Sequence, residues 1–224
     1  MINQIVIVII FIIGLFLLII FNELVYRRLG LNGEVTRKFA HFTATLSAVS
    51  FPFLFTDHWY VLALAIIFFI VLFVSRRTRH LNSINAIERD SFGSFLLPVS
   101  IYITFLVSHI YSDLQLYILP MLILAISDPA AGILGINIKR FNHRIRIFSW
   151  KLHKTWLGSI TFFISSFFIS ILVLYYTRSH FDLVTFGIAL TVAMVSTIIE
   201  MFSIRGTDNL FIPISVVAVL ILTG

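Results

Sequence analysis

The chain has 224 residues, of which 59% are hydrophobic and only 12% are charged. A soluble domain would carry about 25% charged residues, so lipid rather than water is the expected solvent for most side chains. Cysteine is absent, which excludes disulfides, thiolate metal sites and cysteine nucleophiles. In so apolar a chain, the net charge of +6 indicates loops that face an anionic membrane surface rather than a nucleic-acid partner.

Eight apolar segments approach the length of about 20 residues that a membrane-spanning helix needs. In chain order they run over 3–21, 39–56, 59–75, 95–110, 115–135, 158–176, 183–201 and 210–224. The first lacks a basic start and a small-residue cleavage site, so we interpret it as an anchor rather than a signal peptide. The last stops at Gly224, which leaves seven spans as the alternative. We expect an all-α, polytopic transmembrane bundle that forms one integral membrane domain over residues 1–224.

The positive charges alternate between the loops that join these segments. All of the 16 Lys and Arg residues except Arg178 lie in alternate loops, that is, in every second loop along the chain. The alternate loops carry Arg27, Arg28, Arg37 and Lys38; Arg76, Arg77, Arg79 and Arg89; Lys139, Arg140, Arg144, Arg146, Lys151 and Lys154; and Arg205. Basic loops remain in the cytoplasm, so both termini are expected outside, and a bacterial inner membrane is the expected location.

Polar residues gather at the start of the second segment. Glu34, Arg37 and His41 recur at three- and four-residue spacing, which places them on one face of a helix, and Lys38 follows Glu34 by one turn. The simpler interpretation is a basic patch that orients the helix in the membrane. That interpretation does not require His41, which lies one turn inside the apolar segment.

A second polar group precedes the fourth segment. It reads Glu88-Arg89-Asp90-Ser91-Phe92-Gly93-Ser94. A solvated cytoplasmic loop would have the same composition, because acidic and basic residues often alternate in such loops.

The third group contains an acid within a hydrophobic span. Asp128 is followed by Pro129, which removes a backbone donor and should kink or break the helix. Ala131, Gly132 and Gly135 leave one side of the helix bare, so that a ligand or another backbone can approach. A helix-packing seam would need these small residues but not the carboxyl group.

The fourth group joins a basic loop to the last two segments. The loop carries Lys139 and Lys154 and continues into Thr155, Gly158 and Ser159. Further along, Glu200 lies near the end of the seventh segment, and Asp208 and Asn209 precede the eighth. Asp208 or Asn209 would also suit a helix cap, but a cap leaves Glu200 unexplained.

Together these groups predict acids and bases at one membrane face. Carboxylates hold Mg²⁺ through oxygen ligands, and Lys and Arg hold phosphate oxygens. Phosphoryl transfer needs both, because its catalysis is mostly positioning and neutralisation of charge. The chain has no Gly-x-x-x-x-Gly-Lys-Ser/Thr run, which excludes a P-loop enzyme.

At these residues the chain resembles the polyprenol kinase family, which includes dolichol kinase, phytol kinase and CTP-dependent diacylglycerol kinase. Phosphatidate cytidylyltransferase is a more distant relative. The matching pieces, within residues 34–213, are Glu34-x-x-Arg37-Lys38-x-x-His41, Glu88-Arg89-Asp90-x-x-Gly93-Ser94, Asp128-x-x-Ala131-x-x-x-Gly135, Lys154-Thr155-x-x-Gly158-Ser159, and Glu200 with Asp208-Asn209. The family usually has glutamate where this chain has Leu157, which puts part of the nucleotide or metal site in doubt.

The resemblance implies a lipid-alcohol kinase that moves the γ-phosphate of CTP, or another nucleoside triphosphate, onto the hydroxyl of a membrane alcohol. It implies Mg²⁺ at Asp128, Asp208 and Asn209, and catalytic roles for Asp128, His41 and Glu200. Phosphate binding is expected at Arg37, Lys38, Lys139, Lys154, Thr155, Gly158 and Ser159. Secondary candidates are Glu34, Glu88, Arg89, Asp90, Gly132 and Gly135.

Two other functions fit part of the pattern. A cytidylyltransferase would make a CDP-lipid and pyrophosphate rather than a lipid monophosphate and CDP. A transporter would also bury acids and break helices, but its polar path should continue to the other membrane face. The sequence shows little polar lining on the outer halves of the second, fourth and sixth segments.

Overall fold

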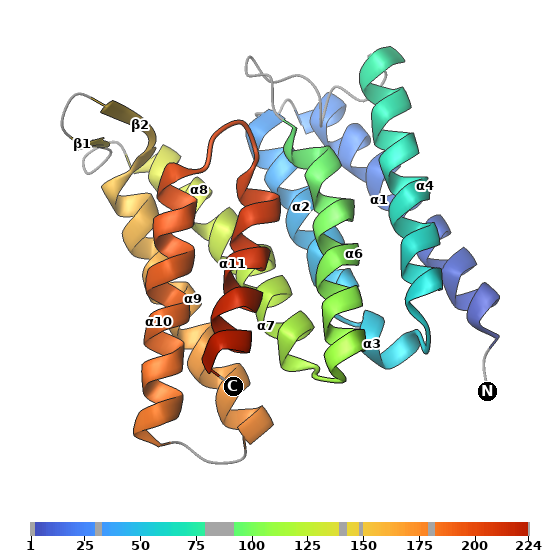
Figure 1. Cartoon of the computed structure of the whole chain (residues 1–224). Helices are drawn as coiled ribbons and strands as arrows, with labels where there is room; N and C mark the ends of the chain where they lie inside the picture. The colour runs from blue at the N-terminus through green and yellow to red at the C-terminus, as the bar shows by residue number, and fades with distance from the viewer. Residues whose placement is uncertain are drawn as a thin grey trace.

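The computed structural model describes residues 3–29, 33–78, 92–138, 143–147, 150–178 and 182–223. These residues form a helical bundle with one small β-hairpin (Figure 1). The helices are α1 (Gln4–Leu29), α2 (Gly33–Ala48), α3 (Phe51–Leu54), α4 (His58–Thr78), α6 (Gly93–Tyr111), α7 (Gln115–Leu122), the π-helical segment η1 (Ile123–Ser127), α8 (Asp128–Asn137), α9 (Trp156–Arg178), α10 (Leu183–Phe202) and α11 (Asp208–Thr223). The strands are β1 (Arg144–Ile147) and β2 (Trp150–Thr155).

Among the residues that the structure describes, six helical segments are long and apolar enough to cross a membrane. They are Gln4–Arg28, His58–Arg76, Gly93–Tyr111, Gln115–Gly135, Trp156–Arg178 and Leu183–Phe202. This confirms the helical bundle and six of the expected segments. The fifth, which combines α7, η1 and α8, has the predicted bounds of 115–135.

The remaining two expected spans are shorter helices. The second is divided into α2, of 16 residues, and α3, of four. The eighth is α11, also of 16 residues. A helix of that length extends about 24 Å, less than the hydrocarbon thickness of about 30 Å. By helix length alone, these two helices are too short to span the hydrocarbon layer, so the described residues contain six full-length spans rather than the predicted eight.

Proline explains why the second span divides. Pro52 lies in the first turn of α3 and has no N–H, so it cannot bond the carbonyl of Ala48, where α2 ends. The Tyr117 hydroxyl donates to that carbonyl at 2.8 Å, and both residues are buried. A side chain from α7 thus satisfies a carbonyl that the α2–α3 break leaves open.

The hairpin lies in the most basic loop, where the sequence predicts no strand. Its strands pair antiparallel, with Arg146 opposite Lys151 and Ile147 opposite Trp150. The run Arg144-Ile145-Arg146-Ile147 alternates polar and apolar residues, which is the period of a strand, and Ile145 is fully buried. The all-α prediction therefore needs this correction for the loop.

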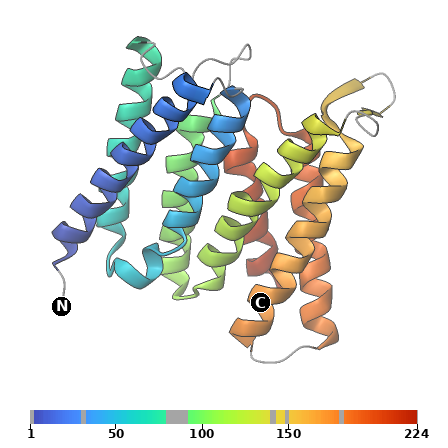
Figure 2. The same cartoon turned by 180° about the vertical axis from the view of Figure 1, so that it is seen from behind.

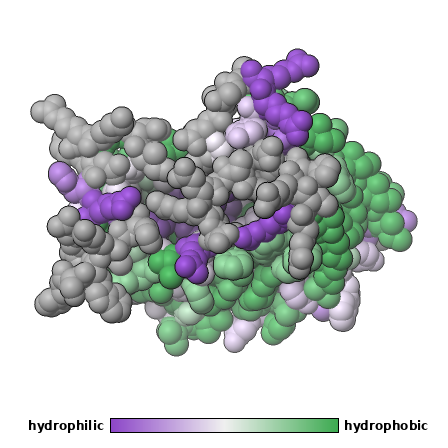
Figure 3. Space-filling model, turned by 90° about the horizontal axis from the view of Figure 1, so that it is seen from above, coloured by the Kyte–Doolittle hydropathy of each residue, from purple (hydrophilic) through white to green (hydrophobic). Residues whose placement is uncertain are grey.

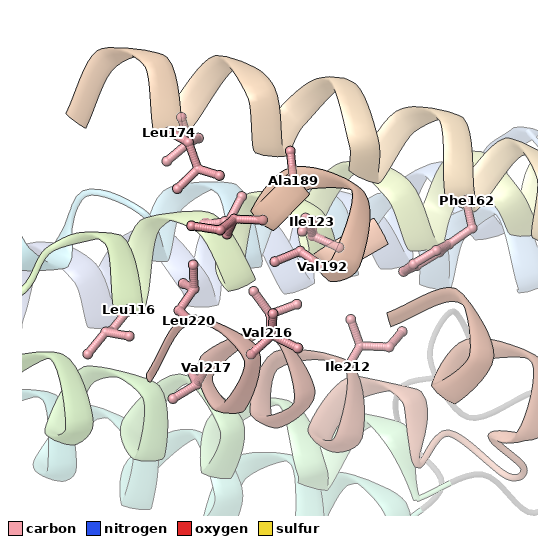
Figure 4. Close-up of a cluster of buried hydrophobic side chains, with 14 of the residues drawn as sticks. Leu116, Ile123, Phe162, Leu174, Ala189, Val192, Ile212, Val216, Val217 and Leu220 are labelled. Atoms are coloured by element: carbon pink, nitrogen blue, oxygen red, sulfur yellow. The ribbon is translucent and has the colours of Figure 1, made fainter. Parts of the chain in front are cut away.

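Two apolar clusters hold the bundle together. One joins α7, η1, α8, α9, α10 and α11, and it includes Ile123, Phe162, Val192 and Val216 (Figure 4). The other joins α1, α2, α3, α4, α6 and α7. Many large apolar side chains on α1, α4 and α9 are exposed, as expected for surfaces that contact lipid.

Both chain ends lie toward the end of the bundle opposite the hairpin (Figures 1 and 2). Seen from the hairpin end, hydrophilic residues are visible at several places on this face, and apolar residues form much of one flank (Figure 3). The elements that carry the predicted polar groups, from the start of α2 to the turn between α10 and α11, meet at this end.

We predict that Tyr117→Phe lowers the free energy of unfolding by about 1–2 kcal/mol, because it leaves the buried Ala48 carbonyl without a donor. Thermal unfolding in detergent measures the effect. Tyr111→Phe is the control, since Tyr111 is exposed at the end of α6. Equal unfolding temperatures for the two variants would contradict the assigned role of the hydroxyl.

Candidate active site

A buried ion pair connects α2 to the start of α8. The Lys38 ammonium lies 2.7 Å from Asp128 Oδ2 and donates a second hydrogen bond to the Asp128 carbonyl at 3.3 Å. His41 Nε2 lies 3.8 Å from the same carboxylate oxygen. All three side chains are nearly inaccessible, so the structure brings together two of the predicted catalytic residues and one predicted phosphate ligand.

Local backbone geometry explains the position of His41. Because Pro129 has no N–H, the carbonyl that it would bond in a π-helical turn, that of Leu124, lacks its usual partner. His41 Nε2 lies 3.3 Å from this oxygen. A carbonyl only accepts hydrogen bonds, so Nε2 carries the proton, and Nδ1 is the basic nitrogen of the neutral ring.

A second charged cluster links the hairpin to α10 and α11. The Lys154 ammonium lies 2.7 Å from Glu200 Oε1 and 3.1 Å from Asp208 Oδ2. The Ser159 hydroxyl donates to Glu200 Oε2 at 3.1 Å. Glu200 is therefore held at both oxygens, and Lys154 is held by two acids from different helices.

The two clusters act on each other electrostatically. Burial tends to lower the pKa of Lys154, but the carboxylates of Asp208, Glu200 and Asp128 outweigh it and raise that pKa above its usual value. Asp128 contributes although it is paired with Lys38, so the clusters lie close enough to form one site. Lys154 remains a cation throughout the physiological pH range.

Glycines permit the close approach of these elements. A Cβ on Gly132 would lie 2.7 Å from Lys38 Cε, and a Cβ on Gly135 would lie 2.8 Å from Thr155 Oγ1. The Thr155 hydroxyl also accepts a hydrogen bond from the Gly158 N–H at 3.1 Å. The bare side of α8 predicted from the sequence thus receives protein side chains.

Asn209 has a structural contact. Its Nδ2 donates to the Gly93 carbonyl at 2.8 Å and joins the start of α11 to the start of α6. The Phe92 N–H donates to the Arg205 carbonyl at 2.8 Å in the same region. The metal role predicted for Asn209 stays a prediction.

The other predicted residues are placed in part. Arg37 is half-buried on α2. Glu34 lies in α2, but its side chain is not among those described. Lys139, Glu88, Arg89 and Asp90 lie outside the described residues, so their roles remain predictions.

Sequence reasoning missed two buried polar residues on α1. The predicted first span ends at Phe21, but α1 continues to Leu29 and includes Asn22, which is fully buried, and Glu23, which pairs with Arg27 at 2.7 Å. Hydropathy places this stretch in a loop. A helical signal is nevertheless present, because Glu23 precedes Arg27 by four residues.

The acids present suit Mg²⁺ only in part. Among the described side chains, no group of three His, Asp or Glu residues is placed to hold a metal ion alone. Mg²⁺ is usually held by one or two carboxylates together with substrate phosphates and water, so Asp128 and Asp208 remain suitable ligands. The site also has three carboxylates and two ammonium groups, so added positive charge would help a polyphosphate to bind.

Comparison with known proteins supports a family assignment. The chain is 32% identical to a phytol kinase of Synechocystis sp. over 191 residues, which cover 84% of this chain and 78% of that protein. It is 30% identical over 203 residues to an uncharacterized protein of Rickettsia prowazekii, covering 81% and 90% of the two chains. No family model matches, and no solved structure matches. The chain belongs to the polyprenol and phytol kinase family, as its motifs predicted.

We predict that Gly132→Ala lowers the free energy of unfolding by about 1–3 kcal/mol, because the added methyl group displaces Lys38 from the buried Asp128. Gly187→Ala is the matched control, since a Cβ there meets nothing within 4 Å. That change should stabilise its helix slightly. If both variants show the same unfolding temperature in detergent, the close approach of Lys38 to Gly132 is wrong.

Proposed function

We propose that this member of the polyprenol and phytol kinase family transfers the γ-phosphate of CTP, or another nucleoside triphosphate, to the hydroxyl of a membrane alcohol. Isoprenoid alcohols of the phytol, polyprenol or dolichol type are the proposed acceptors, with diacylglycerol as a further one. One observation supports this most: the Lys38–Asp128 pair and the Lys154–Glu200–Asp208 cluster lie within electrostatic range at one end of an apolar bundle.

The donor phosphates are proposed to meet the cations of this site. The ammonium groups of Lys38 and Lys154 now pair with carboxylates, and each can bind phosphate oxygens in their place. Arg37 and Lys139 would add further positive charge around the phosphates. Thr155, Gly158 and Ser159 lie at the junction of β2 and α9, next to Lys154. The hairpin thus delivers a cation to the site from the side where soluble nucleotide arrives.

Asp128 and Asp208 are the proposed holders of Mg²⁺, which when bound would neutralise charge on the phosphate oxygens. Glu200 orients Lys154 through one oxygen and is itself oriented by Ser159 through the other. Lys154 belongs to β2 and the other four residues to α8, α9, α10 and α11, so the packing of four helices and the hairpin sets their geometry.

His41 is the proposed acceptor for the proton of the alcohol. With Nε2 directed at the Leu124 carbonyl, Nδ1 is the nitrogen of the neutral ring that has no proton and can accept one. The alcohol oxygen then forms a bond to the γ-phosphorus, the bond from that phosphorus to the bridging oxygen breaks, and the nucleoside diphosphate leaves. Phosphoryl transfer needs only modest help from a base, so His41 should contribute less than Asp128.

The proposed orientation places the site in the cytoplasm and both termini outside, in the inner membrane of a bacterium. The described cationic positions, except Arg178 at the end of α9, lie toward the hairpin end of the bundle. Cytoplasmic loops carry an excess of Lys and Arg, which supports this orientation.

Transfer of label tests the function. The purified protein in detergent, with phytol and Mg²⁺, should move label from [γ-³²P]CTP to the lipid but none from [α-³²P]CTP. Asp128→Asn should lower transfer by about a hundredfold or more, because it removes both a ligand charge and the partner of Lys38. The same assay with phosphatidate in place of phytol tests the alternative: label from [α-³²P]CTP in that lipid, with release of pyrophosphate, would instead identify a cytidylyltransferase.

The control for that variant is Asp113→Asn. Asp113 lies before α7, near the far end of the bundle, where its Oδ1 accepts from the Gln115 N–H, a bond that asparagine preserves. Asp128→Asn should lower the unfolding temperature, because it leaves the buried Lys38 without its ion-pair partner. Full transfer by Asp113→Asn, together with an Asp128→Asn protein that stays folded at the assay temperature, would assign the loss to chemistry. Retained transfer in Asp128→Asn would remove Asp128 from the mechanism.

Labelling of single cysteines tests the orientation, since the chain has no cysteine of its own. Thr56→Cys lies between α3 and α4, and Ile138→Cys lies after α8 at the hairpin end. A membrane-impermeant maleimide should label Thr56→Cys in intact spheroplasts and Ile138→Cys only after permeabilisation. The reverse pattern would place the site outside.

A further inference from the structure

The turn between α10 and α11 has a strained backbone. Arg205 has a φ of 52° and Gly206 a φ of 86°, both in the left-handed region. Glycine adopts this conformation freely, but arginine does so only where surrounding contacts hold it there. The Thr207 N–H and hydroxyl both donate to the Ile204 carbonyl, at 3.1 and 2.9 Å, and so close the turn around the two left-handed residues.

The start of α6 is bonded to this turn on both sides of Asp208. The Phe92 N–H donates to the Arg205 carbonyl at 2.8 Å, three residues before Asp208. The Asn209 side-chain amide donates to the Gly93 carbonyl at 2.8 Å, one residue after Asp208. We call these two hydrogen bonds the α6 bracket. Through them, the conformation of the turn depends on the position of α6.

The bracket is closely packed. A Cβ on Gly93 would lie 3.0 Å from Asn209 Nδ2 and 3.2 Å from Gly206 Cα, and both Gly93 and Asn209 are buried. The guanidinium carbon of Arg76 lies 5.4 Å from the centroid of the Phe92 ring, a cation–π contact that joins this end of α6 to α4. The bracket therefore has little freedom to shift.

Asp208 contacts a cation that it shares with another helix. The Lys154 ammonium lies 3.1 Å from Asp208 Oδ2 and 2.7 Å from Glu200 Oε1. Glu200 lies in α10 and Asp208 in α11, so the turn between these helices sets the distance between the two carboxylates. Both acids reach one ammonium group only while the turn keeps its conformation.

We propose that Asn209 is a positioning residue, which acts through the α6 bracket to hold Asp208 beside Lys154 and the metal-bound donor phosphates. Its contact with Gly93 uses the amide nitrogen, whereas a metal would need the amide oxygen. A displacement of about 1 Å at a reacting centre can lower a rate by about a hundredfold, so a residue that only positions Asp208 still affects transfer. This inference rests on the proposed kinase function, in which Asp208 holds Mg²⁺.

Asn209→Asp separates positioning from metal binding. It keeps an oxygen that can bind Mg²⁺ but replaces the N–H donor with a carboxylate, which the Gly93 carbonyl repels. Asn209→Asp, like Asn209→Ala, should lower kcat/KM for CTP about tenfold or more, because Asp208 is displaced. It should also raise the Mg²⁺ concentration that gives half-maximal transfer and leave the KM for phytol unchanged.

Two results would overturn the proposal. One is parental transfer by Asn209→Asp at the parental Mg²⁺ requirement, since an oxygen ligand at this position would then be sufficient. The other is an equal rise in the Mg²⁺ requirement and in the KM for phytol, which would indicate a general loss of structure.

Gly93→Ala tests the same contact from the side of α6. The added methyl group displaces Asn209 and Gly206 but changes no side chain that could bind Mg²⁺. The Mg²⁺ requirement should rise as it does in Asn209→Ala. Gly14→Ala is the matched control and should leave it unchanged, because a Cβ there meets nothing within 4 Å. A parental Mg²⁺ requirement in Gly93→Ala would contradict the positioning role.

Unfolding temperatures in detergent test the bracket even if no phosphate is transferred. Asp208→Asn removes the charge that pairs with Lys154 but keeps the Oδ1 that accepts from the Asn209 N–H. If Gly93→Ala displaces Asp208 from Lys154, the double variant should lose less than the sum of the two single losses. Gly93→Ala and Tyr117→Phe, which share no partner, should be additive. Additive losses for Gly93→Ala and Asp208→Asn would overturn the proposal, whatever the transfer assay shows.

Discussion

The structure depends on the pairing of charges that are removed from water. Lys38 and Asp128 hold α2 against α8, while Lys154 holds the hairpin against α10 and α11 through Glu200 and Asp208. Removing one partner from such a pair leaves a buried charge uncompensated, which costs several kcal/mol. For the same reason, one of these ion pairs can separate only when another charged group replaces the departing partner. Fold and proposed chemistry therefore use the same contacts, and a polyphosphate with its cation is the kind of ligand that can replace them.

Backbone carbonyls impose a second constraint, because lipid offers them no hydrogen bonds. Pro52 leaves the Ala48 carbonyl open, and the Tyr117 hydroxyl fills the need. Pro129 leaves the Leu124 carbonyl open, and His41 fills it. In the first case the result is a tie between α2 and α7, and in the second it is a histidine held in one tautomer. The π-helical segment before Asp128 thus positions the proposed base, His41, as well as Asp128 itself.

Hydropathy predicts the long helices well, because a segment that faces lipid must be apolar over its length. It predicts less well where a helix is sheltered or interrupted. Hydropathy predicts a continuous second span although the segment contains Pro52. The strands on either side of the hairpin turn were not predicted, because the many charges of this segment indicate a loop. Asn22 and Glu23 likewise suggest a loop, although α1 continues through them. In each case the local signal is present but weaker than the average over the segment.

The sequence by itself determined that the chain is a helical membrane protein with its cations toward one end, and the order of its motifs was enough to indicate the family. Composition and spacing suffice for this, since each residue's affinity for lipid or water acts independently of its partners. Only the tertiary structure decided that Lys38 pairs with Asp128 and Lys154 with Glu200 and Asp208, that Gly132 accommodates Lys38, and that Asn209 bonds the Gly93 carbonyl. These contacts join residues far apart in the chain, and their geometry depends on how several helices pack at once.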